Sequence, residues 1–376
     1  MKIVKMAAIA TMALTLFASC KKDEPAKEAS KMTIRIDESA LRSLDAPIPG
    51  KTKTAFADLK ITVNDGEVVK VLKDANDIAK AASDEGYTFP VKSKPTNVVV
   101  EANGYVADPE ITTLQGAAKV DDPANAADKV AVFTKKIALI GSTTTIEGPT
   151  TPAGSKDKVY KATVTPKPIV ARIEVAGKIV GQKNADTGLN AFKNIDVEAV
   201  YVNNYLNKKA DTKRYFTPSD GNTAFAGDPA LKAEMYDAIT ATMKASFEAG
   251  TVAAAYQIFP TKDDETEIDH IILKVKLQYD LKVVKNRTKE FEEGYVTIVK
   301  YKEKNAGSIA KFEAAKIYKL ALADLNEHFK TDKDGNPDTP VTPDPEHEGA
   351  NKLTVVVKSY EWQAINIVPD TGGFKK

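Results

Sequence analysis

The sequence predicts a mainly β protein with two antiparallel β-sandwich domains, short helices and a C-terminal extension. Most apolar runs alternate with polar residues at a period of two and are rich in β-branched and aromatic side chains, which indicates strands. Few helical segments separate these runs, so the sheets are expected to be antiparallel rather than built from βαβ units. Roughly 355 residues follow the N-terminal leader, which is too many for one compact core and fits two domains.

Residues 1–19 have the features of a secretory signal peptide. Lys2 and Lys5 form its charged start, and residues 6–18 form an apolar segment that is too short to span a membrane. Exported proteins often carry disulfides, yet this chain contains a single cysteine. Its stability must therefore come from core burial.

That single cysteine, Cys20, directly follows the apolar segment. Residues 17–20, Phe-Ala-Ser-Cys, resemble a bacterial lipobox, although Phe17 stands where the pattern usually has Leu, Val or Ile. We therefore expect Cys20 to be acylated, with chains such as palmitate holding the precursor on a membrane. Residues 22–24, Lys-Asp-Glu, are similar to the signal that sends Bacteroidetes lipoproteins to the outer face of the outer membrane; an ordinary charged tether is the alternative.

A strand is expected within residues 20–42, because Met32, Ile34 and Ile36 alternate there with polar residues. After this strand the chain enters a loop bounded by proline and glycine. Arg42 and Ser43 lie in that loop, and loops with small and polar residues are preferred sites of proteolysis.

Residues 43–158 are expected to form the first sandwich and residues 159–330 the second. In the first, the Asp-Gly pair at residues 65–66 lies between two alternating runs and predicts a hairpin, and Asp74 is expected to cap a short helix. A loop is expected over residues 141–155. The strands expected in this domain are residues 59–63, 67–72, 97–101 and 130–139.

The second domain is expected to contain one long helix among longer strands. Residues 228–250 begin with an Asp cap and a Pro, end at Gly250, and carry apolar residues at a spacing of four. Such an apolar stripe is more often core than binding surface. The strands expected in this domain are residues 169–175, 195–202, 252–259, 268–281, 295–301 and 314–322.

Residues 331–350 carry four prolines and almost no apolar side chains, which predicts a stiff, extended linker outside any core. Residues 351–376 follow as two short strands around a polar turn, beside which stands Trp362, the only tryptophan. An apolar strand pair on such an arm must join a sheet, either in its own domain or in another copy of the protein. The apolar side chains that alternate along the pair are Leu353, Val355, Val357, Ile365 and Ile367.

No catalytic arrangement stands out, and an enzyme is not expected. The chain has no Gly-x-Ser-x-Gly motif, no Gly-rich loop that opens a helix and no spare cysteine. Residues 332–336 resemble the opening of a calcium loop, but Pro337 and Pro343 stand where that loop needs a Gly and a Glu, so no metal is expected there. No other cofactor is expected. A net charge of +1 with mixed signs argues against nucleic-acid binding.

Together these features resemble the fimbrillins, the major fimbrial subunits of Bacteroidales, also called type V pilins. The resemblance covers the whole chain in layout and is most specific at residues 17–20, 40–43, 171–175 and 352–374. It implies two transthyretin-like sandwich domains and a C-terminal donor-strand extension. It also implies a surface fimbria that supports cell adhesion.

The resemblance further implies that an arginine-specific protease matures a lipoprotein precursor. Cleavage is expected between Arg42 and Ser43, with Arg35 as the alternative, and removes the lipid together with the strand around Ile34. The C-terminal strands of another copy would then fill the exposed groove, and this head-to-tail exchange gives a filament. The implied partners are other copies, accessory and anchor subunits, the protease and, for the precursor, the outer membrane.

Two other functions stay open. A fimbrial tip or accessory adhesin would need a host-binding patch, and none is visible in the sequence. A surface glycan-binding lipoprotein that never polymerises would need exposed aromatic side chains, for which Tyr201 and Tyr205 are the nearest candidates; packing within strands is the simpler role for both.

Overall fold

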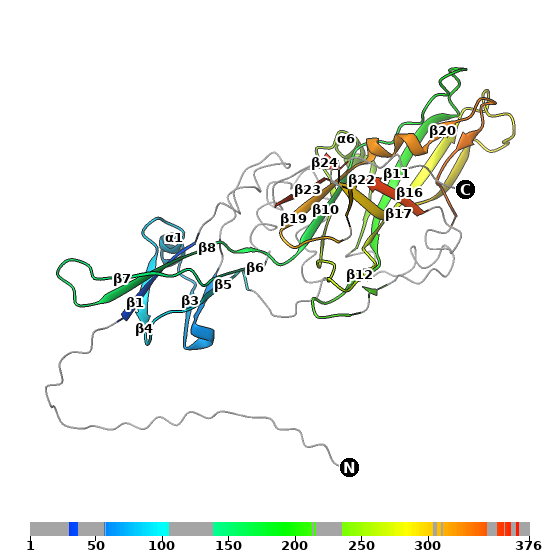
Figure 1. Cartoon of the computed structure of the whole chain (residues 1–376). Coiled ribbons are helices and arrows are strands. Elements are labelled where there is room, and N and C mark those ends of the chain that lie inside the picture. The colour runs from blue at the N-terminus through cyan, green and yellow to red at the C-terminus, as the bar shows by residue number, and fades with distance from the viewer. Residues whose placement is uncertain are drawn as a thin grey trace, which may run out of the picture.

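The computed structural model describes residues 30–36, 56, 58–104, 138–212, 214–215, 235–303, 307–309, 311–343, 352–356, 358–361 and 366–367. These residues form two β lobes that follow one another along the molecule (Figure 1). Strands dominate and the helices are short, which confirms the predicted fold class.

Two sheets face each other in the first lobe and enclose one apolar core. The first sheet has the order β4-β1-β8-β7, with β4 at Tyr87–Val91, β1 at Ser30–Ile36, β8 at Lys158–Val164 and β7 at Glu147–Thr150. The second sheet has the order β3-β2-β5-β6-β9, with β3 at Val68–Leu72, β2 at Leu59–Val63, β5 at Val98–Ala102, β6 at Leu139–Thr143 and β9 at Lys167–Pro168.

Local signals in the first lobe are confirmed. β2 and β3 pair as an antiparallel hairpin through the 3-10 turn Asn64–Gly66, in which Gly66 has a φ of 104°. Helix α1 spans Ala75–Ala81, and the Asp74 side chain accepts a hydrogen bond of 2.8 Å from the backbone N–H of Asn76. Turn and cap residues thus act where the sequence places them.

The second lobe also consists of two facing sheets. One has the order β15-β10-β19-β23, with β15 at Ala254–Ile258, β10 at Ala171–Ala176, β19 at Lys316–Ala321 and β23 at Lys358–Glu361; β24 at Asn366–Ile367 also pairs with β19. The other has the order β14-β11-β16-β17-β18, with β14 at Tyr236–Ala238, β11 at Phe192–Asn203, β16 at His270–Tyr279, β17 at Phe291–Glu303 and β18 at Gly307–Ile309; β22 at Lys352–Val356 also pairs with β17.

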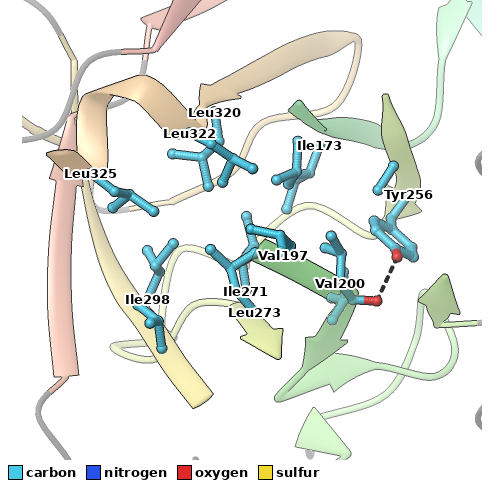
Figure 2. Packing of buried hydrophobic residues seen from close by; sticks show 14 of the residues in the cluster. Ile173, Val197, Val200, Tyr256, Ile271, Leu273, Ile298, Leu320, Leu322 and Leu325 are labelled. Atoms are coloured by element: carbon cyan, nitrogen blue, oxygen red, sulfur yellow. Dashed lines mark hydrogen bonds between the residues drawn. The ribbon is translucent and has the colours of Figure 1, made fainter. Parts of the chain in front are cut away.

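Smaller elements complete this lobe: helix α6 at Ala241–Glu248, the 3-10 helix η5 at Leu322–His328, and the short pairs β12 at Tyr205–Leu206 with β13 at Arg214–Tyr215 and β20 at Lys330–Thr331 with β21 at Pro337–Asp338. The core lies between the two sheets, where Ile173 and Leu320 face Ile271 (Figure 2). The buried Tyr256 hydroxyl donates a 2.9 Å hydrogen bond to the carbonyl of Val200 and so has a partner inside the core.

The helix predicted over residues 228–250 is wrong at residues 236–238, which form a strand. Residues 228–234 lie outside the described part of the chain, and Tyr236–Ala238 form strand β14. The backbone groups of Met235 and Ile239 bond to β11 across the sheet, so their spacing of four does not reflect a helix. Among the described residues 235–250, the α-helix covers Ala241–Glu248, and pairing with a neighbouring strand overrides the local pattern before it.

Strand pairing corrects the predicted topology in two places. Residues 159–164, expected to open the second domain, lie in β8 beside β1 in the first lobe. The loop expected over residues 141–155 contains the end of β6 and all of β7, while most of the strand expected over 130–139 lies outside the described residues. Not every pair is antiparallel, since β1 with β8, β10 with β19, β17 with β22 and β19 with β24 run parallel.

The start of the predicted linker is folded. β20 and β21 pair around a turn in which the Asp332 carboxylate accepts a 2.7 Å hydrogen bond from the backbone N–H of Asn336. Thr342 and Tyr295 then exchange two backbone hydrogen bonds of 2.8 and 2.9 Å. The expectation of an extended linker from residue 331 is therefore wrong as far as residue 343. Residues 344–350 lie outside the described part.

Candidate functional site

The site singled out by the sequence is the strand β1, which lies inside the first sheet. β1 pairs antiparallel with β4, with Met32 opposite Phe89, and parallel with β8, with Met32 opposite Tyr160. Backbone groups on both sides of β1 are therefore engaged in sheet hydrogen bonds. We call the position of β1 between β4 and β8 the β1 slot.

One face of β1 supplies part of the core of the first lobe. Met32 and Ile34 are fully buried, Ile36 is 1% exposed, and all three belong to the apolar cluster that joins the two sheets. This confirms the predicted alternation along β1. Each such side chain stabilises the folded lobe by about 1.5–3 kcal/mol through burial. An empty slot would expose both unpaired backbone groups and an apolar surface.

The other face of β1 packs closely against Gly86, just before β4, and against Thr88 within β4. Thr33 is 7% exposed, and its hydroxyl forms a 2.8 Å hydrogen bond with the hydroxyl of Thr88. A Cβ atom on Gly86 would lie 2.7 Å from Cγ2 of Thr33 and 2.8 Å from the carbonyl oxygen of Ile34, and Gly86 has a φ of 71°. Glycine is required there both for its conformation and for the approach of β1.

Two ion pairs, which the sequence alone did not reveal, join β1 to its surroundings. The Lys31 ammonium contacts the carboxylate of Asp157, just before β8, and the Arg35 guanidinium lies 2.6 Å from the carboxylate of Asp84. The hydrogen bond from Lys31 holds the pKa of Asp157 below its usual value. All four side chains are at least partly exposed to solvent, so each pair adds little stability, but it favours the register in which β1 pairs with β4 and β8.

The two candidate cleavage sites differ in their surroundings. Arg35 lies within β1, paired across the sheet with Thr163, so its peptide bond is part of a strand. Proteases act on exposed, extended chain, and a paired strand resists them. Arg42 and Ser43, like the lipidation candidate Cys20, lie outside the described residues.

The C-terminal strands lie against the second lobe at the margins of both sheets. Leu353 and Val355 belong to β22, which runs parallel to β17, and β23 pairs with β19. Ile367 belongs to β24, which also pairs with β19. The tail therefore pairs with one strand of each sheet in the same chain. Val357, Trp362 and Ile365 lie outside the described residues.

The aromatic residues considered for glycan binding are not on the surface. Tyr201 is 7% exposed and packs against the rings of Tyr236 and Tyr295, at centroid distances of 4.6 and 6.5 Å. Burial raises the pKa of Tyr201 well above its usual value. Tyr205 is 3% exposed within the main core of the lobe. Both residues thus serve packing, and neither offers a sugar a stacking face.

Within the described ranges, no group of three or more His, Cys, Asp or Glu side chains could hold a metal ion. No helix in those ranges is long and apolar enough to cross a membrane.

Solved structures similar to this chain come from Bacteroidales. A candidate cell adhesion protein from Bacteroides eggerthii has 15% identity and a TM-score of 0.48, with 91% of this chain and 98% of that one covered. A fimbrilin from Porphyromonas gingivalis has 14% identity and a TM-score of 0.47, with 92% and 99% covered. No protein-family model and no curated protein matches the chain.

Proposed function

We propose that this chain is a structural subunit of a surface fimbria, and that it polymerises by strand exchange triggered by proteolysis. The observation that carries the proposal is the β1 slot. β1 lies in the middle of a sheet with a buried apolar face, and Arg42 follows it in the sequence, where a cut would separate the strand from the rest of the chain.

Loss of β1 leaves a surface that a second strand would satisfy. β4 and β8 would each lose a row of backbone partners, and the core would lose Met32, Ile34 and Ile36. An added strand restores both main-chain hydrogen bonds and apolar contacts, which is the physical basis of recognition by strand addition. The first lobe would then recruit a strand from another chain.

The C-terminal tail has the properties of that strand. Its apolar residues alternate as those of β1 do. It follows residue 343, and its described strands lie at the margins of the two sheets, where they pair with β17 and β19. Each of its strands is bonded to one described strand, β17 or β19, whereas β1 is bonded to strands on both sides. Because the donor lobe and the acceptor lobe differ, the exchange is head-to-tail and extends into a filament.

The remaining parts of the proposal concern export and maturation. Cys20 is acylated, so the precursor is an outer-membrane lipoprotein, and an arginine-specific protease cuts between Arg42 and Ser43 at the cell surface. The mature subunit then joins other copies and is completed by accessory and anchor subunits. The filament supports cell adhesion. A tip or accessory adhesin would use the same slot. Glycan binding without polymerisation is less well supported, because its two candidate aromatic residues, Tyr201 and Tyr205, are buried.

The proposal is tested with a purified precursor that lacks the lipid. The chain from residue 21 onward is treated with an arginine-specific protease, and its size is followed by light scattering and electron microscopy. Polymers are expected only after β1 has been removed. The matched control is Arg42→Ala, which should remain monomeric under the same treatment. A cleaved chain that has lost residues 30–36 and still stays monomeric would contradict the proposal.

A further inference from the structure

We propose that the donor tail enters the β1 slot in a single register and direction, with residues 352–357 taking the places of residues 31–36. The inference rests on the proposed strand exchange and adds to it the chemistry by which the slot recognises its partner, a second copy of this chain. The tail would run parallel to β8 and antiparallel to β4, as β1 does.

The first support is a match in sequence between the two ends of the chain. Residues 31–36 read Lys-Met-Thr-Ile-Arg-Ile, and residues 352–357 read Lys-Leu-Thr-Val-Val-Val. Each begins with lysine, has threonine at the third place and has a large apolar residue at the second, fourth and sixth. The β1 residues and their proposed replacements are Lys31 and Lys352, Met32 and Leu353, Thr33 and Thr354, Ile34 and Val355, Arg35 and Val356, and Ile36 and Val357.

The core side of the slot excludes neighbouring registers in the same direction. It requires apolar side chains at the positions of Met32, Ile34 and Ile36, which are at most 1% exposed. A shift of one residue in either direction places Thr354 in the core together with a lysine. If the tail shifts by two residues, Asn351 or Ser359 occupies one of these core positions. Among the registers within two residues of it, the proposed one alone fills all three positions with apolar groups, and buried polar groups without partners are costly.

The outer side of the slot supports the same alignment. At the third place a threonine would again meet the hydroxyl of Thr88, as Thr33 does at 2.8 Å. The space beside Gly86, which has no Cβ atom, accommodates a β-branched side chain there. At the first place Lys352 would meet the carboxylate of Asp157, which loses Lys31 on cleavage. Val356 offers no replacement for Arg35, so Asp84 is expected to lack its present partner in the fibre.

The remaining alternative is a tail that enters the slot in the opposite direction. Val357, Val355 and Leu353 would then fill the three core positions, and all three are apolar. Reversal would place Val356 opposite Thr88 and remove the hydroxyl pair. It would also place the shorter valine at the position of Met32, where leucine is the closer match in volume. The forward direction therefore satisfies the slot on both faces.

Disulfide trapping between copies of the processed chain tests the inference. The processed protein contains no cysteine, because Cys20 is the only one and precedes the cut. Threonine hydroxyls 2.8 Å apart mark positions at which two cysteines can be bridged. Processed Thr88→Cys/Thr354→Cys should therefore give a covalent ladder on a non-reducing gel. Thr88→Cys/Val356→Cys, the matched variant for the reversed tail, should give at least tenfold less.

The outcomes separate this inference from the proposed function. A ladder from the Val356→Cys chain alone would overturn the direction, and polymers without a ladder from either chain would overturn the register while leaving strand exchange intact. If the unsubstituted processed chain forms no polymer, the proposed function fails and this inference falls with it.

A charge reversal provides a second measurement if the cysteine chains fold poorly. Lys352→Glu should slow polymerisation severalfold, and combining it with Asp157→Lys should restore the rate. Failure of the second substitution to restore the rate would contradict the contact between the two residues.

Discussion

Replacing Ile34 with alanine should destabilise the precursor but not the fibre. Ile34 is fully buried in the core of the first lobe, and its backbone is paired with both β4 and β8. The substitution removes three carbons, worth about 2 kcal/mol in transfer free energy, and leaves a cavity that raises the loss to roughly 3–4 kcal/mol. The residue is absent from the processed chain, so a fibre assembled from it should be unaffected.

Hydrogen exchange of the backbone amides in β4 and β8 measures the stability of the first lobe, which contains Ile34, separately from that of the second lobe. Exchange through opening of the first lobe should accelerate by about a hundredfold or more in the Ile34→Ala precursor, since each 1.4 kcal/mol is a factor of ten. Ile34→Val is the matched control, with an expected loss of about 0.5–1.5 kcal/mol. A loss below about 1 kcal/mol for alanine, or an equal loss in precursor and fibre, would refute the reasoning.

Four further predictions follow from the same account. Cys20→Ala should leave unprocessed precursor and few fibres; normal membrane fractionation and fibre yield would contradict it. Arg42→Ala should trap a lipidated monomer whose slot still holds β1, seen as a precursor-sized band that pellets with membranes. Deleting Leu353–Lys376 should give processed monomers that cannot extend a fibre, and normal fibres by microscopy would count against the donor tail. Because Lys31 lowers the pKa of Asp157 from its ordinary 3.8, this contribution to precursor stability is present above that value and lost as pH falls through the lowered pKa; Asp157→Asn should abolish this acid-dependent loss in urea titrations.

Local sequence signals predicted the elements that depend on neighbouring residues. The Asp-Gly turn gave the β2–β3 hairpin, Asp74 gave the start of α1, and the alternation of Met32, Ile34 and Ile36 gave the buried face of β1. Each of these features is decided within a few residues, by turn geometry, by capping or by the two faces of a strand.

Features that depend on distant partners could not be predicted in this way. The apolar spacing before α6 has the period of a helix, yet Tyr236–Ala238 form a strand because β11 offers an edge to pair with. The position of β1 between β4 and β8 depends on a strand more than a hundred residues away. For the same reason the pairs of Lys31 with Asp157 and Arg35 with Asp84 had no signal in the sequence.

The proposed assembly requires that β1 leaves the subunit before the subunit joins a fibre. The N-terminal residue of subunits isolated from purified, shed fibres tests this most directly, by Edman degradation or by the intact mass of the chain. These subunits should begin at Ser43 and contain no residue of β1. Fibre subunits that begin upstream of Ile36, and so retain the strand that fills the slot, would contradict it.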